Sequence, residues 1–75
     1  MLFEKTAIVT GAASGIGYAV AQALRQEGAQ VVMADVNEAL LIESARELGG
    51  VPFVGNLTRR EDCRRLVEFT VERFG

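Results

Sequence analysis

The chain has 75 residues, of which 49% are hydrophobic, and its formal net charge is −2. A chain of this length buries one small hydrophobic core, so we expect one domain at most over residues 1–75. The mixed charges exclude the basic surface of a nucleic-acid-binding protein, and no stretch approaches the roughly 18 apolar residues of a membrane span.

Cysteine and histidine usage restricts the chemistry further. Cys63 is the only cysteine and histidine is absent, so an intrachain disulfide is impossible and we expect no metal site. We expect Cys63 to be a small apolar residue on a helix face. Residues 1–5 contain no basic segment that leads into a signal-like apolar run. The expected setting is therefore cytoplasmic and reducing.

The first half of the chain predicts a strand, a helix and a second strand. Residues 6–10 form a short apolar run that ends at Gly11, which is typical of a strand buried on both faces. Apolar residues then recur with helical spacing until Gly28, which stops the helix. The expected buried face of this helix consists of Ile16, Ala19, Val20, Ala23 and Leu24. Residues 31–34 predict a second buried strand, which ends at Asp35.

The second half of the chain continues the alternation. We expect Asn37 to cap a second helix, which ends at Gly49 and Gly50. The expected inner face of this helix consists of Leu41, Ser44, Ala45 and Leu48. Residues 51–54 predict a third strand, in which Pro52 is tolerated near the strand start. Residues 58–61 predict a capping box for a last helix. Its expected buried face consists of Cys63, Leu66, Val67, Thr70, Val71 and Phe74.

The resulting βαβαβα order predicts the fold. Strands joined by helices of this length run parallel and cross over with right-handed connections. We therefore expect an α/β fold with a Rossmann-type parallel sheet, which is half of a doubly wound three-layer sandwich. Ligands of such sheets bind at the carboxyl ends of the strands, which here lead into residues 11–17, Asp35 and Asn56. An open outer edge of the third strand would favour association.

The segment after the first strand, Thr-Gly-Ala-Ala-Ser-Gly-Ile-Gly at residues 10–17, is rich in glycine. Gly11 can adopt the positive φ of a tight turn, Gly15 lacks the Cβ that would keep a pyrophosphate from the backbone, and Gly17 allows helix and strand to pack closely. The N–H groups and positive dipole end of the following helix favour an anion. The hydroxyl of Ser14 either donates to a phosphate oxygen or forms the turn. The segment therefore predicts a dinucleotide-binding site.

Asp35, at the end of the second strand, is placed to accept hydrogen bonds from an adenosine ribose. Its charge would lie beside the 2′-phosphate of NADP. Two like charges about 4 Å apart repel by about 4 kcal/mol at an effective dielectric constant of about 20. The positions from which a cation could reach that phosphate are neutral, and they are Ser14, Val36 and Asn37. We therefore expect NAD to be preferred over NADP.

The spacing Thr10-Gly11-x-x-x-Gly15-Ile16-Gly17 resembles the signature of the short-chain dehydrogenases/reductases, and the resemblance extends over the whole chain. It implies that Ser14 and Ile16 contact the pyrophosphate and that Asp35 contacts the adenosine ribose. It also implies that Asn56 and Leu57 contact the adenine. The family usually has an aspartate at the position of Asn56. An amide oxygen can still accept a hydrogen bond from the adenine amino group, but without the charge.

The resemblance also implies where the chemistry is carried out. The family uses a serine, and a tyrosine and a lysine separated by three residues, all further along the chain. None of these is present here, and no lysine occurs in the four residues after Tyr18, the only tyrosine. We therefore expect these residues to be the N-terminal part of a single NAD(P)-binding Rossmann domain, without catalytic residues and inactive alone.

The complete protein is then expected to be an NAD-dependent oxidoreductase that moves a hydride between nicotinamide and a small alcohol or ketone. The resemblance implies a homo-oligomer. A non-catalytic dinucleotide-binding module is the alternative interpretation. An S-adenosylmethionine methyltransferase also uses a glycine turn and an acid after the second strand, but the glycine spacing argues against it. A phosphate-binding loop of the Gly-Lys-Ser/Thr type is excluded because no such sequence follows the glycines.

Overall fold

The computed structural model describes residues 2–75, which form three strands and three helices in alternation. Met1, the first residue of the expected domain, lies outside this range. The elements are β1 (Thr6–Thr10), α1 (Gly15–Gln26), β2 (Gln30–Asp35), α2 (Glu38–Leu48), β3 (Val51–Val54) and α3 (Arg60–Phe74). The predicted α/β fold is confirmed.

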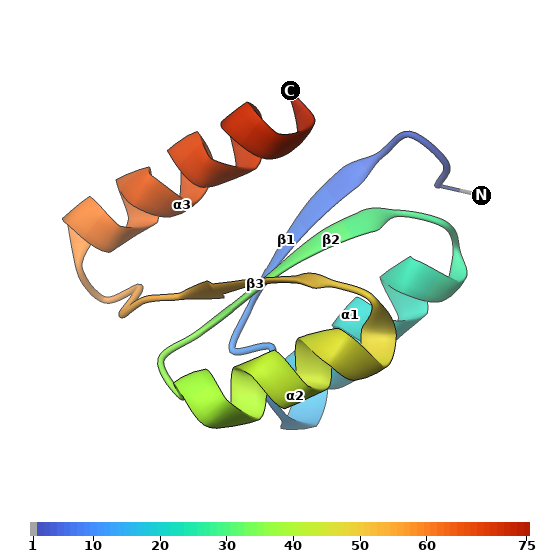
Figure 1. The fold of residues 1–75 in the computed structure, drawn as a ribbon, viewed down its shortest axis with the longest axis horizontal. Coiled ribbons are helices and arrows are strands. Elements are labelled where there is room, and N and C mark those ends of the chain that lie inside the picture. Colours follow the sequence, from blue (N-terminus) through green and yellow to red (C-terminus); the bar gives the residue numbers. More distant parts are fainter. Residues whose placement is uncertain (1) are drawn as a thin grey trace.

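The strands of the described residues form one parallel sheet in the order β1-β2-β3. The sheet lies between α3 and the pair α1 and α2, so that the molecule has three layers (Figure 1). In the register, Val9 pairs with Met33 and Met33 pairs with Pro52. Pro52 is tolerated because β3 lies at the edge of the sheet, where one side of the backbone needs no partner.

Each face of the sheet has its own hydrophobic core. Val31 and Met33 of β2 face α1 and α2, whereas the alternate residues Val32 and Ala34 face α3, and all four are fully buried. A central strand that is buried on both faces needs a continuous apolar run, which explains why residues 31–34 do not alternate with polar residues.

The predicted buried face of α1 is wrong. Ile16 is 85% exposed and Val20 is 45% exposed, whereas the side of the helix that carries Gly17 and Ala21 packs on the sheet, with Ala21 fully buried. Ala19 and Ala23 are exposed too, and only Leu24 of the expected set is half-buried. Helix and sheet approach closely here, so the contact face carries the smallest residues and hydrophobicity does not mark it.

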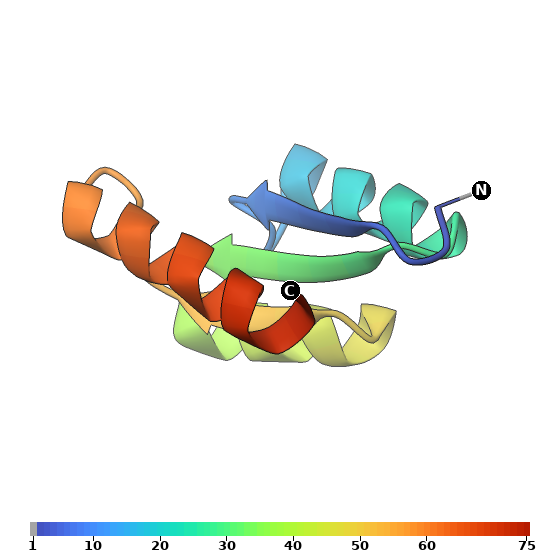
Figure 2. The same cartoon turned by 90° about the horizontal axis from the view of Figure 1, so that it is seen from above.

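The predicted buried face of α3 is correct only in part. Leu66 and Thr70 are buried, and Cys63 and Phe74 are half-buried, but Val67 and Val71 are 53% and 57% exposed. Figure 2 shows that α3 crosses β2 and β3 and leaves β1 uncovered on this side. Val67 and Val71 therefore have no part of the sheet to pack against and stay exposed.

The predicted capping box at the start of α3 is also wrong. The N-cap is Arg59, whose side chain makes no capping hydrogen bond. The backbone N–H and the hydroxyl of Thr58 both donate to Oδ1 of Asn56, at 3.1 and 2.6 Å. Asp62 accepts from the N–H of Asn56 at 2.8 Å. These local hydrogen bonds thus occupy the N–H and the hydroxyl of Thr58, the groups that a capping box would use.

The termini of α2 agree with the sequence. The side chain of Asn37 accepts from the N–H of Leu40 at 3.1 Å, and Gly49 ends the helix with a φ of 71°. The guanidinium of Arg25, on α1, donates to the carbonyl of Leu48 at 3.0 Å and to that of Ala29 at 2.8 Å. Arg25 therefore ties the end of α2 and the residue before β2 to α1.

Replacing Arg25 by Met should lower the free energy of unfolding by about 2 kcal/mol, because two carbonyl groups lose a charged donor in a partly buried place. The urea midpoint of unfolding measures the change. Arg64→Met, on the exposed surface of α3, is the control and should change the midpoint little. Equal midpoints for the two variants would contradict the role assigned to Arg25.

Candidate functional site

The three strands end around one cavity of about 390 Å³. Its lining residues all lie at or just after a strand end, and they are Thr10, Gly11, Ala34, Asp35, Val36, Gly55, Asn56, Leu57 and Thr58. Four of them were predicted as site residues from the sequence, namely Gly11, Asp35, Asn56 and Leu57. The other five could have been found by extending the strand-end rule to the immediate neighbours of those four.

The remaining predicted site residues do not line this cavity. Ser14, Gly15, Ile16 and Gly17 lie at the beginning of α1, next to the turn that starts at Gly11. The backbone of this turn is attached to β2, because the N–H of Ala12 donates to the carbonyl of Ala34 at 3.1 Å. Cavity and helix start therefore form two neighbouring parts of one edge of the sheet.

The glycines of the turn meet two different requirements. Gly11 and Gly15 have φ angles of 60° and 62°, and a Cβ on either would meet no atom within 4 Å. Space is thus open beside both residues, and the backbone conformation alone favours glycine. A Cβ on Gly17 would overlap the Gly11 carbonyl and lie 2.9 Å from the Thr10 carbonyl oxygen. Gly17 is therefore required by the close packing of α1 on the end of β1.

The start of α1 is suited to an anion. Ser14 is the N-cap with an extended backbone, but its hydroxyl does not cap the helix. The first N–H groups of a helix have no partner within the helix, and the helix dipole adds positive charge there. The Ile16 side chain, in the first turn of α1, is 85% exposed to solvent. Backbone N–H groups, the Ser14 hydroxyl and open space at Gly15 together could hold a phosphate group.

Asp35 connects the cavity to the glycine turn. Its Oδ2 accepts from the N–H of Ala13 at 3.0 Å, and its Oδ1 accepts from the N–H of Asn37 at 3.1 Å. Desolvation raises the pKa of this carboxyl group, but hydrogen bonds from the N–H groups of Asn37, Ala13 and Val36 outweigh it and lower the pKa below its usual value. Asp35 is therefore a carboxylate at neutral pH, and the three N–H donors leave one of its four acceptor sites for a ligand hydroxyl.

Asn56 lines the same cavity and follows β3, the strand next to the one that ends at Asp35. Its Oδ1 already accepts two hydrogen bonds from Thr58, as described for the start of α3. Because a backbone N–H is one of the donors, the oxygen and nitrogen of this amide are fixed in orientation. The amide oxygen that we expect to face the adenine amino group is thus committed to the turn in this structure.

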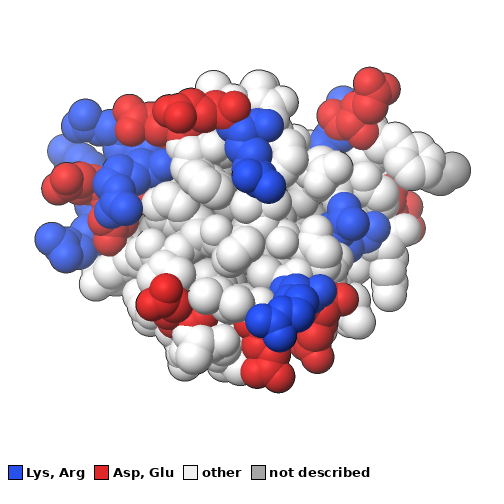
Figure 3. Space-filling view, viewed as in Figure 1, with Lys and Arg blue, Asp and Glu red and all other residues white. Residues whose placement is uncertain are grey.

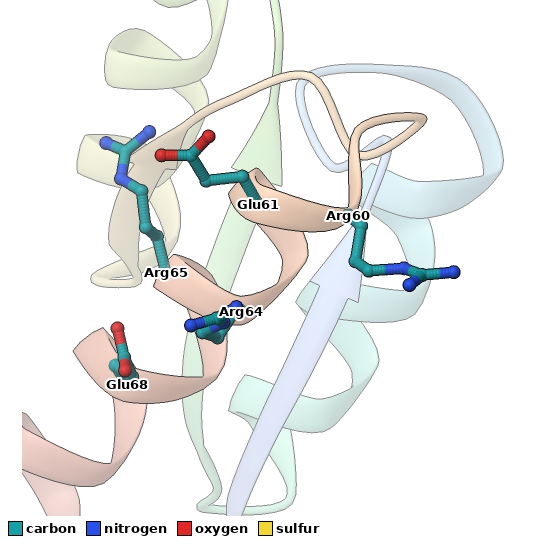
Figure 4. A pocket seen from close by; sticks show the side chains of 5 residues that line it. All are labelled: Arg60, Glu61, Arg64, Arg65 and Glu68. Atoms are coloured by element: carbon teal, nitrogen blue, oxygen red, sulfur yellow. The ribbon is translucent and has the colours of Figure 1, made fainter.

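A second cavity, of about 450 Å³, lies on the surface of α3 (Figure 4). The Arg60 side chain points away from those of Glu61 and Arg65. Positive and negative side chains alternate around the beginning of this helix (Figure 3). The lining residues come from one helix, and they are Arg60, Glu61, Arg64, Arg65 and Glu68. Side chains of mixed charge that diverge make no site for one class of ligand, so the strand-end cavity is the candidate site.

Tyr18 lies on α1 and its hydroxyl donates to the Glu47 carboxylate of α2 at 3.3 Å. Desolvation, together with the negative charge of Glu47 and this hydrogen bond, raises the pKa of Tyr18. A tyrosine that acts as general acid and base needs a pKa shifted the other way, toward neutrality. Tyr18 therefore serves as a link between two helices.

Residues 2–75 contain no group of three or more cysteine, aspartate or glutamate side chains placed to hold a metal ion. No helix in the same range is long and apolar enough to cross a membrane.

Comparisons with known proteins place the chain in one family. The family profile of the short chain dehydrogenases matches residues 5–75. The chain is 38% identical to a diacetyl reductase [(S)-acetoin forming] of Staphylococcus epidermidis, over 96% of this chain and 30% of the relative. It is 46% identical to the L-fucose dehydrogenase of Bos taurus, over 95% of this chain and 27% of the relative.

A solved structure gives the same result. The crystal structure of the apo form of LigD from Sphingobium sp. strain SYK-6 superimposes with a TM-score of 0.96 at 29% identity, over 100% of this chain and 34% of the other. The chain thus spans about a third of the length of the proteins that it matches. With the family profile matching almost from end to end, the chain belongs to the short-chain dehydrogenase/reductase family.

Proposed function

We propose that the chain binds NAD and forms the dinucleotide-binding part of an oxidoreductase. The observation that carries the proposal is the Asp35 carboxylate, which lines the strand-end cavity and is hydrogen-bonded to the glycine turn at Ala13. The carboxylate offers an acceptor site for ribose hydroxyls, and the N–H groups of the neighbouring turn offer donors for phosphates. Both lie at the same edge of the sheet. Bound NAD would supply the hydride-transfer chemistry.

The glycine turn is proposed to hold the pyrophosphate. The open space beside Gly11 and Gly15 supports this, since a ligand can approach the backbone there without meeting a Cβ. Ser14 and Ile16 are proposed to contact the same group through the hydroxyl and the backbone at the start of α1, and Gly17 to keep that start against β1.

Asp35 is proposed to hold the adenosine ribose and to select NAD over NADP. Its lowered pKa keeps the charge at neutral pH, so a 2′-phosphate would meet a full negative charge. Asn56 and Leu57, which line the same cavity after β3, are proposed to contact the adenine. Because Oδ1 of Asn56 is engaged by Thr58, we propose that the amide NH₂ group faces the base as a donor.

The substrate of the whole protein is proposed to be a small alcohol or ketone. The names of the relatives, a diacetyl reductase and an L-fucose dehydrogenase, support this class of substrate. We also propose that the whole protein is cytoplasmic, because Cys63 is a free thiol. We propose that it forms a homo-oligomer, because the family resemblance implies one. Binding of NAD without turnover by the whole protein would favour the alternative of a non-catalytic dinucleotide-binding module.

Replacing Asp35 by Asn should reverse much of the cofactor preference. The amide retains an oxygen that can accept from Ala13, but the negative charge is lost, so the ratio of the Kd for NADP to that for NAD should fall about tenfold or more. Isothermal titration with both dinucleotides measures the ratio. Glu38→Gln, which removes a charge from the first turn of α2 outside the cavity, is the control. Wild-type protein that binds NADP as tightly as NAD would refute the selection.

Alanine at Gly15 should weaken NAD binding about tenfold or more, because a Cβ would occupy the space proposed for the pyrophosphate. The cost in stability should be about 1–2 kcal/mol, from the left-handed backbone. Gly49→Ala is the matched control, since Gly49 has a similar φ of 71° at the end of α2, away from the cavity. It should cost at least as much stability, because its Cβ would also lie 3.3 Å from Nη2 of Arg25, and it should leave the Kd for NAD unchanged. Equal Kd values for the two variants would place the pyrophosphate elsewhere.

A further inference from the structure

Ser44 is a buried polar residue on the apolar face of α2. It is 4% exposed and stands beside Leu41 and Ala45, both of which belong to the core. Its hydroxyl donates to the carbonyl oxygen of Ala13 at 2.7 Å, across 31 residues of sequence. A buried hydroxyl is costly unless it is hydrogen-bonded, and a buried carbonyl equally needs a donor. The two groups therefore satisfy each other between α2 and the glycine turn.

The bond acts on the residues that lead into α1. The N–H of Ala13 donates to Asp35, and the carbonyl of Ala13 accepts from Ser44, so both peptide groups of this residue are held. A trans peptide is planar, with its N–H opposite its carbonyl. The bond that directs the Ala13 carbonyl to α2 thus directs the N–H of Ser14 away from α2. Ser44 thereby fixes the orientation of a donor at the start of α1.

We propose that Ser44 is a positioning residue of the phosphate-binding turn, an inference that rests on the proposed dinucleotide binding. The residue lines no part of the strand-end cavity and acts through the backbone of Ala13 and Ser14. Its contribution is specific to the part of the ligand that the turn holds. The ribose and adenine depend on Asp35 and on the residues after β3, so removal of the Ser44 hydroxyl affects a phosphate-bearing ligand and spares a phosphate-free one.

Replacing Ser44 by Ala tests this specificity. The Kd for NAD and for ADP-ribose should rise about tenfold, the equivalent of one well-placed hydrogen bond, while the Kd for adenosine stays within about twofold. Thr70→Val is the matched control, because it removes a hydroxyl that is also buried and donates to a helix carbonyl, that of Leu66 at 2.8 Å, on α3. The control should leave all three Kd values unchanged.

A second measurement needs no ligand. Amide hydrogen exchange of Ala12 and Ala13, whose N–H groups donate to Ala34 and Asp35, should become about tenfold faster in Ser44→Ala, while exchange of Val31 and Val32 in the buried middle of β2 stays slow. Ser44→Cys, with a weaker donor of similar size, should give intermediate exchange rates and intermediate Kd values. Uniformly faster exchange in the core would show a general loss of stability and would overturn the positioning role.

The outcomes separate the two proposals. Wild-type protein that binds no dinucleotide would refute the proposed function, and the exchange rates at Ala12 and Ala13 would then still decide whether Ser44 orders the turn. Wild-type protein that binds NAD, together with an unchanged Kd in Ser44→Ala, would refute the positioning role alone. An equal rise of the Kd for NAD and for adenosine would also refute it.

Discussion

The hydrogen bond between the Ala13 backbone and the Asp35 carboxylate joins the ends of β1 and β2 and determines the shape of the site. Burial opposes the charge of this carboxylate, and three backbone N–H groups stabilise it. Those donors come from both sides of the cavity edge, since Ala13 lies in the glycine turn and Asn37 lies at the start of α2. One ionised side chain thus fixes the position of two loops, which constrains both the turn and the helix that follows β2.

Much of the fold could be predicted from the sequence, because its strands and turns are encoded locally. The apolar run at 31–34, the capping side chain of Asn37 and the glycine at 49 each depend on near neighbours in the chain. Gly17 was also identified correctly as a packing glycine, since the spacing of the turn places it under β1. In each of these cases the deciding contact lies within a few residues or follows directly from the spacing of the turn.

The errors have the opposite origin. Whether Val67 or Phe69 of α3 is buried depends on how far the helix reaches across the sheet. The ring centroids of Phe69 and Phe53 are 5.4 Å apart. Whether Thr58 caps a helix depends on the competing acceptor of Asn56. The role of Ser44 depends on a carbonyl 31 residues away, and its only sequence signal is a hydroxyl on an otherwise apolar helix face. Tertiary contacts decide the first and the third case, whereas the second is a local competition for Thr58 within the turn.

The two sides of the cavity pack against hydrophobic cores of different size. The glycine turn and Asp35 are attached to the core between the sheet and the pair α1 and α2, in which Val31, Met33 and Leu41 are fully buried. The turn after β3 is attached to the smaller core under α3, which leaves Ile8 of β1 41% exposed. Local stability follows the density of buried contacts. The side proposed for phosphate and ribose is therefore the more rigid one. The side proposed for adenine is held by the hydrogen bonds of Asn56 with Thr58 and Asp62, and also by that of the Gly55 N–H with the Asp35 carbonyl and that of the Cys63 thiol with the Leu57 carbonyl. The side-chain oxygen of Asn56 maintains this turn, a function that requires an acceptor and no charge.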